Sequence, residues 1–192
     1  MNDFQIRNIL VDDIRKKYRT TIQAKNLIVQ EMVLCRGFAR IDVALVNGSM
    51  HGFEIKSSED TLARLKNQLE YYSQCFDYLT IVASEKHINN ILTNYPLWLG
   101  ISLASAEDAG LVIKKIRPAR RNKNINTFSL MQLLWKSELL EIANLYSQKN
   151  ISTLNKGKII ERLILNIREA DLHKATRQQL KSRTTWAIAE AV

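Results

Sequence analysis

Two stretches of alternating side chains, joined by Asn47-Gly48, most constrain how this chain of 192 residues folds. Alternation over residues 40–46 separates two sets of side chains: Ile41, Val43 and Leu45 from Asp42, Ala44 and Val46. That period is typical of a β-strand. Asn-Gly is a strong signal for a tight hairpin turn, and residues 50–57 continue as a second extended stretch. The sequence therefore predicts an antiparallel hairpin.

The predicted hairpin carries Asp42 on one arm and Glu54 and Lys56 on the other. Glu54 and Lys56 are two positions apart, so their side chains leave the same face of the strand. Two converging carboxylates need a proton, a cationic partner or a metal ion, and Lys56 supplies only one positive charge. The alternative is a solvated Asp42 beside a surface ion pair of little energetic value.

If the three side chains meet, they suit a hard divalent ion such as Mg²⁺, with the main-chain carbonyl of Ile55 as a further ligand. Such an ion polarises a phosphate oxygen and lowers the pKa of a bound water molecule. Lys56 could then orient or deprotonate that water, or offset charge in the transition state.

A helix is predicted from about Glu59 to Cys75, with Ser57-x-x-Asp60 as its capping box. Three leucines at helical spacing form a buried stripe: Leu62, Leu65 and Leu69. Gln68 and Tyr72 are four positions apart and share one face, and Arg64 extends that row by one turn. If the stripe packs on the sheet, this row borders the mouth of the hairpin site.

Three short motifs follow one another between residues 37 and 72: Gly-x-x-Arg-x-Asp, Glu-Ile-Lys and Gln-x-x-x-Tyr. This order resembles the PD-(D/E)XK, or restriction-endonuclease-like, nuclease superfamily. It is most similar to the branch that includes exonuclease domains of bacterial recombination enzymes, and we assign it to a small bacterial or phage branch with the Gln-x-x-x-Tyr motif. The resemblance covers roughly residues 25–105. Ile41 stands where the family name has proline, a common variation.

The resemblance implies a metal-dependent phosphodiesterase core. Asp42 and Glu54 would be ligands of Mg²⁺ or Mn²⁺, and Lys56 would be the catalytic lysine. Gln68 and Tyr72 would have supporting catalytic roles.

Two segments precede the hairpin. Residues 2–19 are expected to form a helix, with Asp3 as its N-cap and Phe4 among its core residues. Residues 22–34 are compatible with a second helix or, from residue 28, with a strand. In several branches of the superfamily a helix here lends another acid to the metal site, so Glu31 is a candidate ligand; the alternative is an exposed carboxylate.

The continuous apolar run over residues 78–83 predicts a buried strand parallel to the second arm of the hairpin. A helix over residues 84–94 and strands over 100–104 and 111–117 complete a small mixed sheet. We therefore expect an α/β, restriction-endonuclease-like core over residues 1–125. Residues 126–192 are expected to add a basic helical extension, with helices over 128–147, 156–167 and 172–183, and the extension loosely resembles a SAP-type DNA-binding motif.

The charge balance favours a polyanionic partner. Lys and Arg number 28 against 19 Asp and Glu, a formal charge of +9, and contact with phosphates releases counterions. The basic residues expected to bind nucleic acid are Arg40, Arg64, Lys114, Lys115, Arg117, Arg120, Arg121, Lys123, Lys156 and Lys158. The alternative for the cluster between residues 114 and 123 is a solvated strand edge.

Other composition features narrow the class of protein. No apolar run approaches the length of a membrane span, and the first residues lack the features of a signal peptide, so a cytoplasmic protein without a membrane partner is expected. Cys35 and Cys75 are expected to be free thiols. The expected function is metal-dependent hydrolysis of a phosphodiester in DNA, with RNA as the other substrate and a homodimer or partner protein left open. The alternative is a binding or regulatory module that keeps the fold without catalysis.

Overall fold

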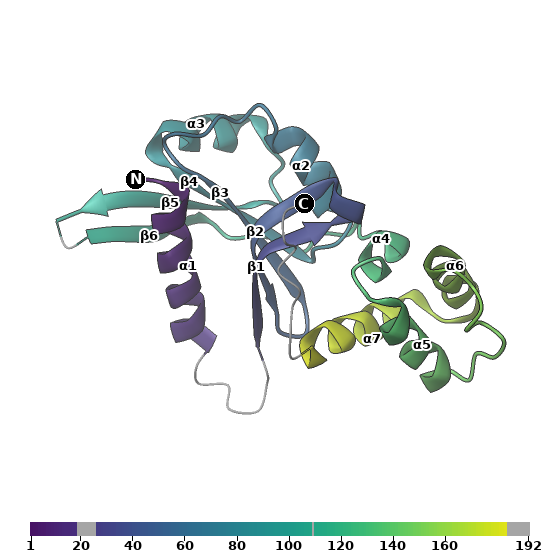
Figure 1. Cartoon of the computed structure of the whole chain (residues 1–192). Coiled ribbons are helices and arrows are strands. Elements are labelled where there is room, and N and C mark those ends of the chain that lie inside the picture. The colour runs from purple at the N-terminus through teal and green to yellow at the C-terminus, as the bar shows by residue number, and fades with distance from the viewer. Residues whose placement is uncertain (19–25, 109, 184–192) are drawn as a thin grey trace.

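The computed structural model describes residues 1–18, 26–108 and 110–183, which form one six-stranded mixed sheet with helices on both faces (Figure 1). The predicted α/β class is confirmed. The strands follow one another in space as they do in sequence: β1 (Leu27–Leu34), β2 (Ala39–Val46), β3 (Met50–Lys56), β4 (Tyr78–Ser84), β5 (Gly100–Glu107) and β6 (Gly110–Arg117).

The predicted hairpin is confirmed as β2 and β3, which pair antiparallel from Val46↔Met50 to Val43↔Phe53. Gly48 takes the left-handed φ of 111° that the turn requires, a conformation that glycine adopts without steric cost. β3 and β4 pair in parallel, as the apolar run predicted, and β4 and β5 are also parallel. β1 and β6 are the antiparallel edges of the sheet.

Helix α1 (Asp3–Tyr18) covers one face of the sheet, where its buried stripe packs on apolar residues of β2 and β3. Two predicted details are wrong. The N-cap is Asn2, whose Oδ1 accepts the main-chain N–H of Gln5 at 3.0 Å. Phe4 is exposed because the buried stripe is formed by other positions, with Ile6 and Leu10 at its start. Residue 19, the predicted helix end, lies outside the described residues.

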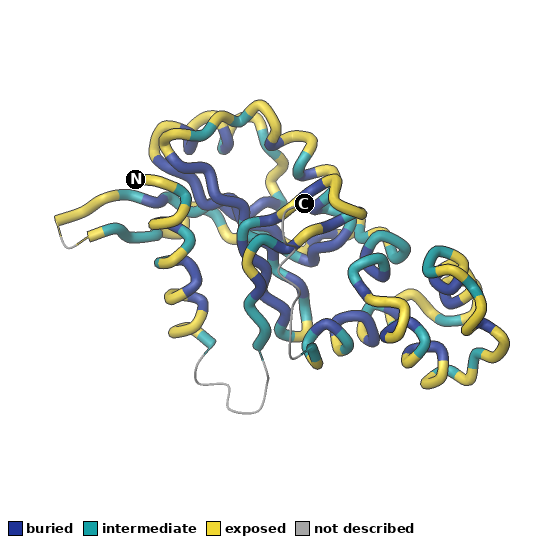
Figure 2. Tube along the Cα trace, in the orientation of Figure 1, coloured by how far each residue is buried: buried dark blue, intermediate teal, exposed yellow. Residues whose placement is uncertain are grey.

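Helices α2 (Leu65–Tyr72) and α3 (Glu85–Asn94) belong to the other layer, and Figure 2 shows that the strands between the layers are buried. The helix predicted from residue 59 begins only at Leu65. The Asp60 carboxylate accepts the N–H and the hydroxyl of Ser57, at 2.8 and 2.6 Å, so this capping pattern closes a turn and no helix follows it directly. His87 of α3 is buried rather than at the surface, and its Nε2 lies 3.1 Å from the Ser57 carbonyl oxygen.

β1 resolves the open choice for residues 28–34 in favour of a strand, while residues 22–25 lie outside the described residues. The strand is irregular at Glu31, which has a left-handed φ of 52° between the pairs Gln30↔Val43 and Met32↔Ile41. Opposite this irregularity β2 changes face: Ile41 packs in the same apolar cluster as Ala44, not with Val43 as simple alternation predicted. Asp42 is the residue at which the side chains of β2 switch from one face of the sheet to the other.

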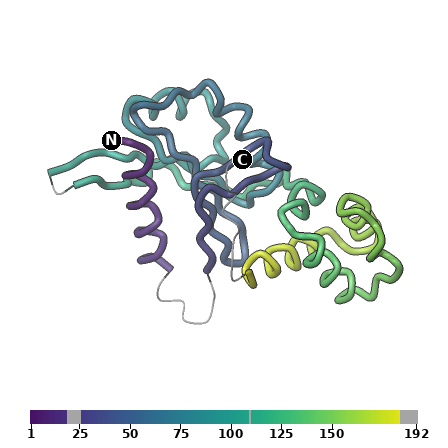
Figure 3. The backbone as a smooth tube through the Cα atoms, in the orientation of Figure 1, coloured from purple at the N-terminus to yellow at the C-terminus, as the bar shows by residue number. Residues whose placement is uncertain are grey.

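The C-terminal extension is helical, as predicted, but its first helix is broken in two. The Glu138 carboxylate accepts the N–H of Trp135 at 2.6 Å and starts a new helix there. The helices are α4 (Thr127–Met131), α5 (Lys136–Leu145), α6 (Lys156–Asn166) and α7 (Glu169–Ser182). α7 turns back toward the sheet (Figure 3), and one apolar cluster runs from the sheet into all four helices.

No described helix combines the length and the apolar character that are needed to cross a bilayer. Cys35 and Cys75, the two cysteines, are free, as predicted.

Candidate functional site

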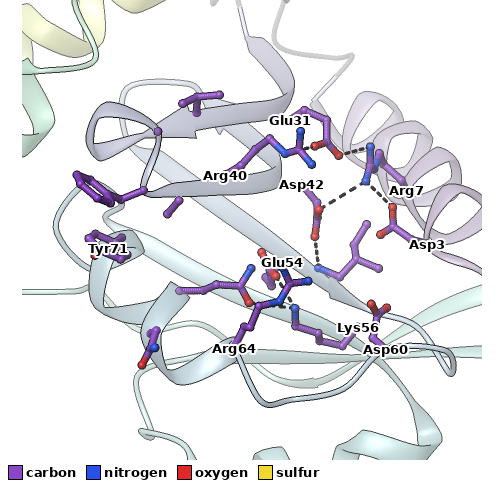
Figure 4. A pocket seen from close by; sticks show the side chains of 17 residues that line it. Asp3, Arg7, Glu31, Arg40, Asp42, Glu54, Lys56, Asp60, Arg64 and Tyr71 are labelled. Atoms are coloured by element: carbon purple, nitrogen blue, oxygen red, sulfur yellow. Dashed lines mark hydrogen bonds and ion pairs between the residues drawn. The ribbon is translucent and has the colours of Figure 1, made fainter. Parts of the chain in front are cut away.

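A cavity of about 980 Å³ opens where β2 and β3 diverge, and Asp42, Glu54 and Lys56 all line it (Figure 4). The last paired positions of the two strands are Val43 and Phe53. Beyond them the Asp42 side chain spans the gap, and its Oδ2 accepts the main-chain N–H of Ile55 at 2.6 Å. The three charged side chains of the hairpin therefore meet at one site.

The second arm of the hairpin is joined to α2 by a buried polar network. Lys56 Nζ donates to Glu54 Oε1 at 2.7 Å and to Gln68 Oε1 at 3.1 Å. Gln68 Nε2 donates to the Tyr72 hydroxyl at 3.2 Å. Glu54 and Lys56 are only 3% and 5% exposed, so their ion pair is shielded from solvent. The spacing of Gln68 and Tyr72 thus brings both side chains to the acid and the lysine.

Tyr72 has one hydroxyl proton and two acceptors at 2.7 Å, the main-chain oxygen of Arg40 and Glu54 Oε2. A carbonyl oxygen can only accept. When Tyr72 donates to Arg40, a hydrogen bond to Glu54 requires a proton on the carboxyl group. Burial raises the pKa of Glu54 and so favours the protonated form, while the charge of Lys56 acts in the opposite direction.

The pKa of Asp42 is also raised by its surroundings. Burial and the negative charge of Glu54 raise the pKa of Asp42 to about 7, although the hydrogen bond from Ile55 acts in the opposite direction. Two neighbouring carboxylates in a desolvated pocket hold a proton where a cation would otherwise offset their charge. The site therefore has the electrostatic character of a cation-binding site.

Arg7 of α1 connects Asp42 to two further acids. Its guanidinium lies 3.5 Å from Asp42 Oδ1 and forms ion pairs with Asp3 and Glu31. Glu31 also accepts from Arg40 Nε at 2.6 Å. Glu31 therefore lines the cavity, as predicted for an extra ligand, but it does so from a strand and with two arginines bound to it.

The residues present fit Mg²⁺ or Mn²⁺ in a limited way. In residues 1–18, 26–108 and 110–183, no three His, Cys, Asp or Glu side chains are grouped so that they could hold a metal. Asp42 and Glu54 supply two carboxylates. The N–H and C=O of a strand residue point to the same side, so the Ile55 carbonyl lies on the Asp42 side with its amide. Mg²⁺ commonly uses one or two carboxylates and completes its shell with water and phosphate oxygens, so this donor set suits it.

Two of the predicted nucleic-acid-binding residues, Arg40 and Arg64, line the cavity and are exposed. The basic cluster of residues 114–123 begins on β6, at the opposite edge of the sheet from β1. Lys114 is ion-paired with Glu107, and Arg117 Nε donates to the Leu99 carbonyl at 2.9 Å.

The remaining basic residues of this cluster are separate from the cavity. Arg121 lies 4.0 Å from Asp77, while three others are exposed: Lys115, Arg120 and Lys123. In the extension Lys156 Nζ donates to the Gln132 carbonyl at 2.7 Å, and Lys158 is exposed. None of these residues lines the cavity, so their role in binding nucleic acid stays a prediction.

Sequence reasoning missed the part of the cavity wall formed by Asp3, Arg7 and Asp60. The available signals were the spacing of Asp3 and Arg7, four apart on one helix, and the Ser57-x-x-Asp60 pattern, which by themselves predict only capping. It also missed Phe38 and Tyr71, for which no local pattern indicates a site. Figure 4 shows Tyr71 on the opposite side of the cavity from Asp3 and Arg7.

Three similarities to known proteins were found. A family model described as bacteriophage P4 protein cII matches residues 2–187. Protein cII of Enterobacteria phage P4 is 31% identical over 129 residues, which are 67% of this chain and 49% of that protein, so the chain spans about half the length of this curated relative. A solved structure, the SPO1766 protein of unknown function from Silicibacter pomeroyi, has a TM-score of 0.46 and 22% identity over 80% of this chain and 100% of that one.

Proposed function

The chain belongs to the bacteriophage P4 protein cII family, and we propose that this member is a metal-dependent nuclease that hydrolyses phosphodiester bonds in DNA. The proposal depends on one observation: an aspartate of β2 and a glutamate and lysine of β3 line the same cavity. The raised pKa of Asp42 and the burial of Glu54 support it, because both make a cation a favourable partner. The restriction-endonuclease-like assignment of the core is part of this proposal, supported by the six-stranded mixed sheet.

In the proposed reaction Asp42, Glu54 and the Ile55 carbonyl hold Mg²⁺ or Mn²⁺. A bound ion of this kind polarises a phosphate oxygen and offsets its charge. Lys56, held by Glu54 and Gln68, orients the attacking water and stabilises negative charge that develops on the phosphate. Tyr72 fixes the Glu54 carboxylate through its hydroxyl.

The basic residues supply the affinity for DNA in this proposal. Arg40 and Arg64 flank the cavity. Nine Lys and Arg against three acids between residues 149 and 183 give this part of the chain an excess of positive charge, which attracts phosphates. We include the SAP-like assignment of the extension, a cytoplasmic location and a homodimer or partner protein only as parts of the proposal.

The direct experiment is a nuclease assay on single-stranded and double-stranded DNA with Mg²⁺ or Mn²⁺. We expect Asp42→Asn and Lys56→Met to lower the cleavage rate at least about 100-fold, because each removes a group that acts at the phosphate. The matched controls are Asp12→Asn and Lys16→Met on α1, where both side chains are exposed. Unchanged cleavage in both site variants would remove the proposed site.

A second candidate is a nucleic-acid-binding module without catalysis. The observation that favours it is the saturation of the acids by protein cations, since Arg7 is paired with Asp42 and Lys56 with Glu54. Such a module binds DNA equally in Mg²⁺ and in chelator and cuts no substrate. Calorimetric titration with Mn²⁺ separates the two, because only the nuclease loses ion binding on Asp42→Asn.

A further inference from the structure

The rim of the candidate cavity carries an aromatic pair that the proposed chemistry does not use. The rings of Phe38 and Tyr71 are nearly parallel, with an interplanar angle of 9° and centroids 6.0 Å apart. Both residues line the cavity. Tyr71 is half-buried on α2, whereas Phe38 is 73% exposed, so one ring supports the other and most of the Phe38 ring faces solvent.

The backbone before Phe38 is held in an unusual conformation. Cys35, Arg36 and Gly37 have φ values of 49°, 60° and 95°, so three consecutive residues lie in the left-handed region. Two of them are not glycine, and such backbone strain is retained where the surrounding structure enforces it, often at ligand sites. Leu34 before the turn and Ala39 after it are both buried. The turn therefore presents Phe38 to solvent between two anchored residues.

The surroundings of the aromatic pair are basic and polar. Arg40, Arg64 and Asn67 line the same cavity and are exposed. An aromatic face beside cationic side chains suits a ligand with a flat ring and a phosphate backbone. Aromatic platforms bordered by positive charge are the usual way in which proteins bind unpaired nucleotides.

We propose that Phe38, supported by Tyr71, stacks on an unpaired nucleobase, so that the substrate at this site is a single-stranded nucleic acid or a single-stranded end. Bases inside a duplex are covered on both faces by their neighbours and cannot meet the ring. Four positions along the chain, about 13 Å in an extended strand, separate Phe38 from Asp42. The stacked base therefore belongs to a nucleotide close to the phosphate that lies at Asp42 and Glu54. The phosphates of the neighbouring nucleotides then reach Arg40 and Arg64.

The position of the bound strand relative to a reacting phosphate rests on the proposed nuclease function. The stacking contact itself is measured by binding alone, without cleavage. We would measure fluorescence anisotropy of labelled oligodeoxyuridine and oligouridine of about 20 nucleotides, which differ only in the sugar, and of a blunt DNA duplex, all in EDTA. We expect Phe38→Ala to weaken binding of the single strand about tenfold, and of the duplex by less than about twofold. Phe38→Trp should retain the affinity. If Phe38→Ala loses affinity for both oligonucleotides, the site binds unpaired nucleotides with either sugar. If it loses affinity for only one, the site selects the sugar of that oligonucleotide.

Phe4→Ala is the matched control, since Phe4 is also a surface phenylalanine, 68% exposed, and it does not line the cavity. Affinity within about twofold of the native protein in Phe38→Ala, or equal losses in Phe38→Ala and Phe4→Ala, would overturn the stacking contact. Phe38 is exposed, so its replacement leaves the fold intact. If Phe38→Ala loses affinity but the native protein shows no metal-dependent cleavage, the stacking contact is supported and the nuclease proposal is removed. If the native protein cleaves DNA but Phe38→Ala binds normally, the nuclease proposal is supported and the stacking contact is removed.

Discussion

At the scale of single residues, Asp42 shows how the candidate site costs stability. Its carboxylate is partly buried beside Glu54, and both effects raise its pKa from the ordinary value of 3.8 to about 7. The folded protein thus binds a proton more tightly at this site than the unfolded chain does. The free energy of unfolding is therefore highest below about pH 4 for this group, and it falls as the pH rises toward 7.

Asp42→Asn removes this penalty, because the amide stays neutral. Without a divalent ion we expect the variant to be about 1–3 kcal/mol more stable than the native protein at pH 8. The difference should shrink toward pH 4, where the native carboxyl group is protonated. Urea unfolding in EDTA at several pH values measures it. Asp12→Asn, at an exposed position of α1, should show no such pH-dependent gain, and a loss of stability in Asp42→Asn at pH 8 would contradict the electrostatic account.

At the scale of secondary-structure elements, the cavity depends on how closely β2 and β3 approach their neighbours. Gly52 of β3 lies opposite Ala44 of β2. A methyl group on Gly52 would overlap Ile41 Cδ1 and lie 2.7 Å from Leu79 Cδ2, both in the buried core. The strand therefore has no room for a side chain here.

Gly52→Ala should lower the free energy of unfolding by about 1–3 kcal/mol, since the added methyl group forces core side chains out of place. Gly157→Ala on α6 is the matched substitution. Its methyl group meets Asn155 Oδ1 at 3.6 Å, an ordinary contact, so it should stabilise the protein by about 0.5 kcal/mol through the helix preference for alanine. Chemical denaturation of both variants tests the difference in sign, and equal effects would show that packing at Gly52 is not limiting.

The sequence predicts features that depend on residues close together in the chain better than features that depend on residues far apart. Alternation and Asn47-Gly48 are local signals, and they correctly predicted the β2–β3 hairpin. They did not determine whether Asp42 meets Glu54 and Lys56, because that depends on the face that Asp42 takes. The turn at Ser57 shares one hydrogen bond with a capping box, from the Ser57 N–H to the Asp60 carboxylate, so its sequence could not show that no helix follows directly.

The rest of the site depends on contacts between residues far apart in the chain. Arg7 reaches Asp42 across 35 positions, and Tyr72 reaches the Arg40 carbonyl across 32. The face change of β2 at Asp42 follows from the irregular pairing at Glu31 on the neighbouring strand. No local pattern contains this information, because it arises only when the strands and helices pack together.

At the scale of the whole molecule, a buried ion pair ties the helical extension to the sheet. Arg177 Nη2 of α7 lies 2.7 Å from Asp77 Oδ1, just before β4. The other oxygen of Asp77 accepts the N–H of Met50, the first residue of β3, at 2.7 Å. The same acid therefore anchors the start of the hairpin's second arm and the last described helix, and the extension is part of the support of the site-bearing strand.

Arg177→Met should lower the free energy of unfolding by about 3 kcal/mol, because it leaves the Asp77 carboxylate, only 1% exposed, without its closest cation. The matched control is Arg168→Met, which removes a similar pair with Asp171 at 2.8 Å from a side chain that is 82% exposed, and which should therefore cost far less stability. Urea titrations of the two variants at pH 7 compare them directly. Equal losses would mean that the extension is held by apolar packing alone. A folded Arg177→Met protein should keep the proposed nuclease activity, because Arg177 does not line the candidate cavity and acts on it only through stability.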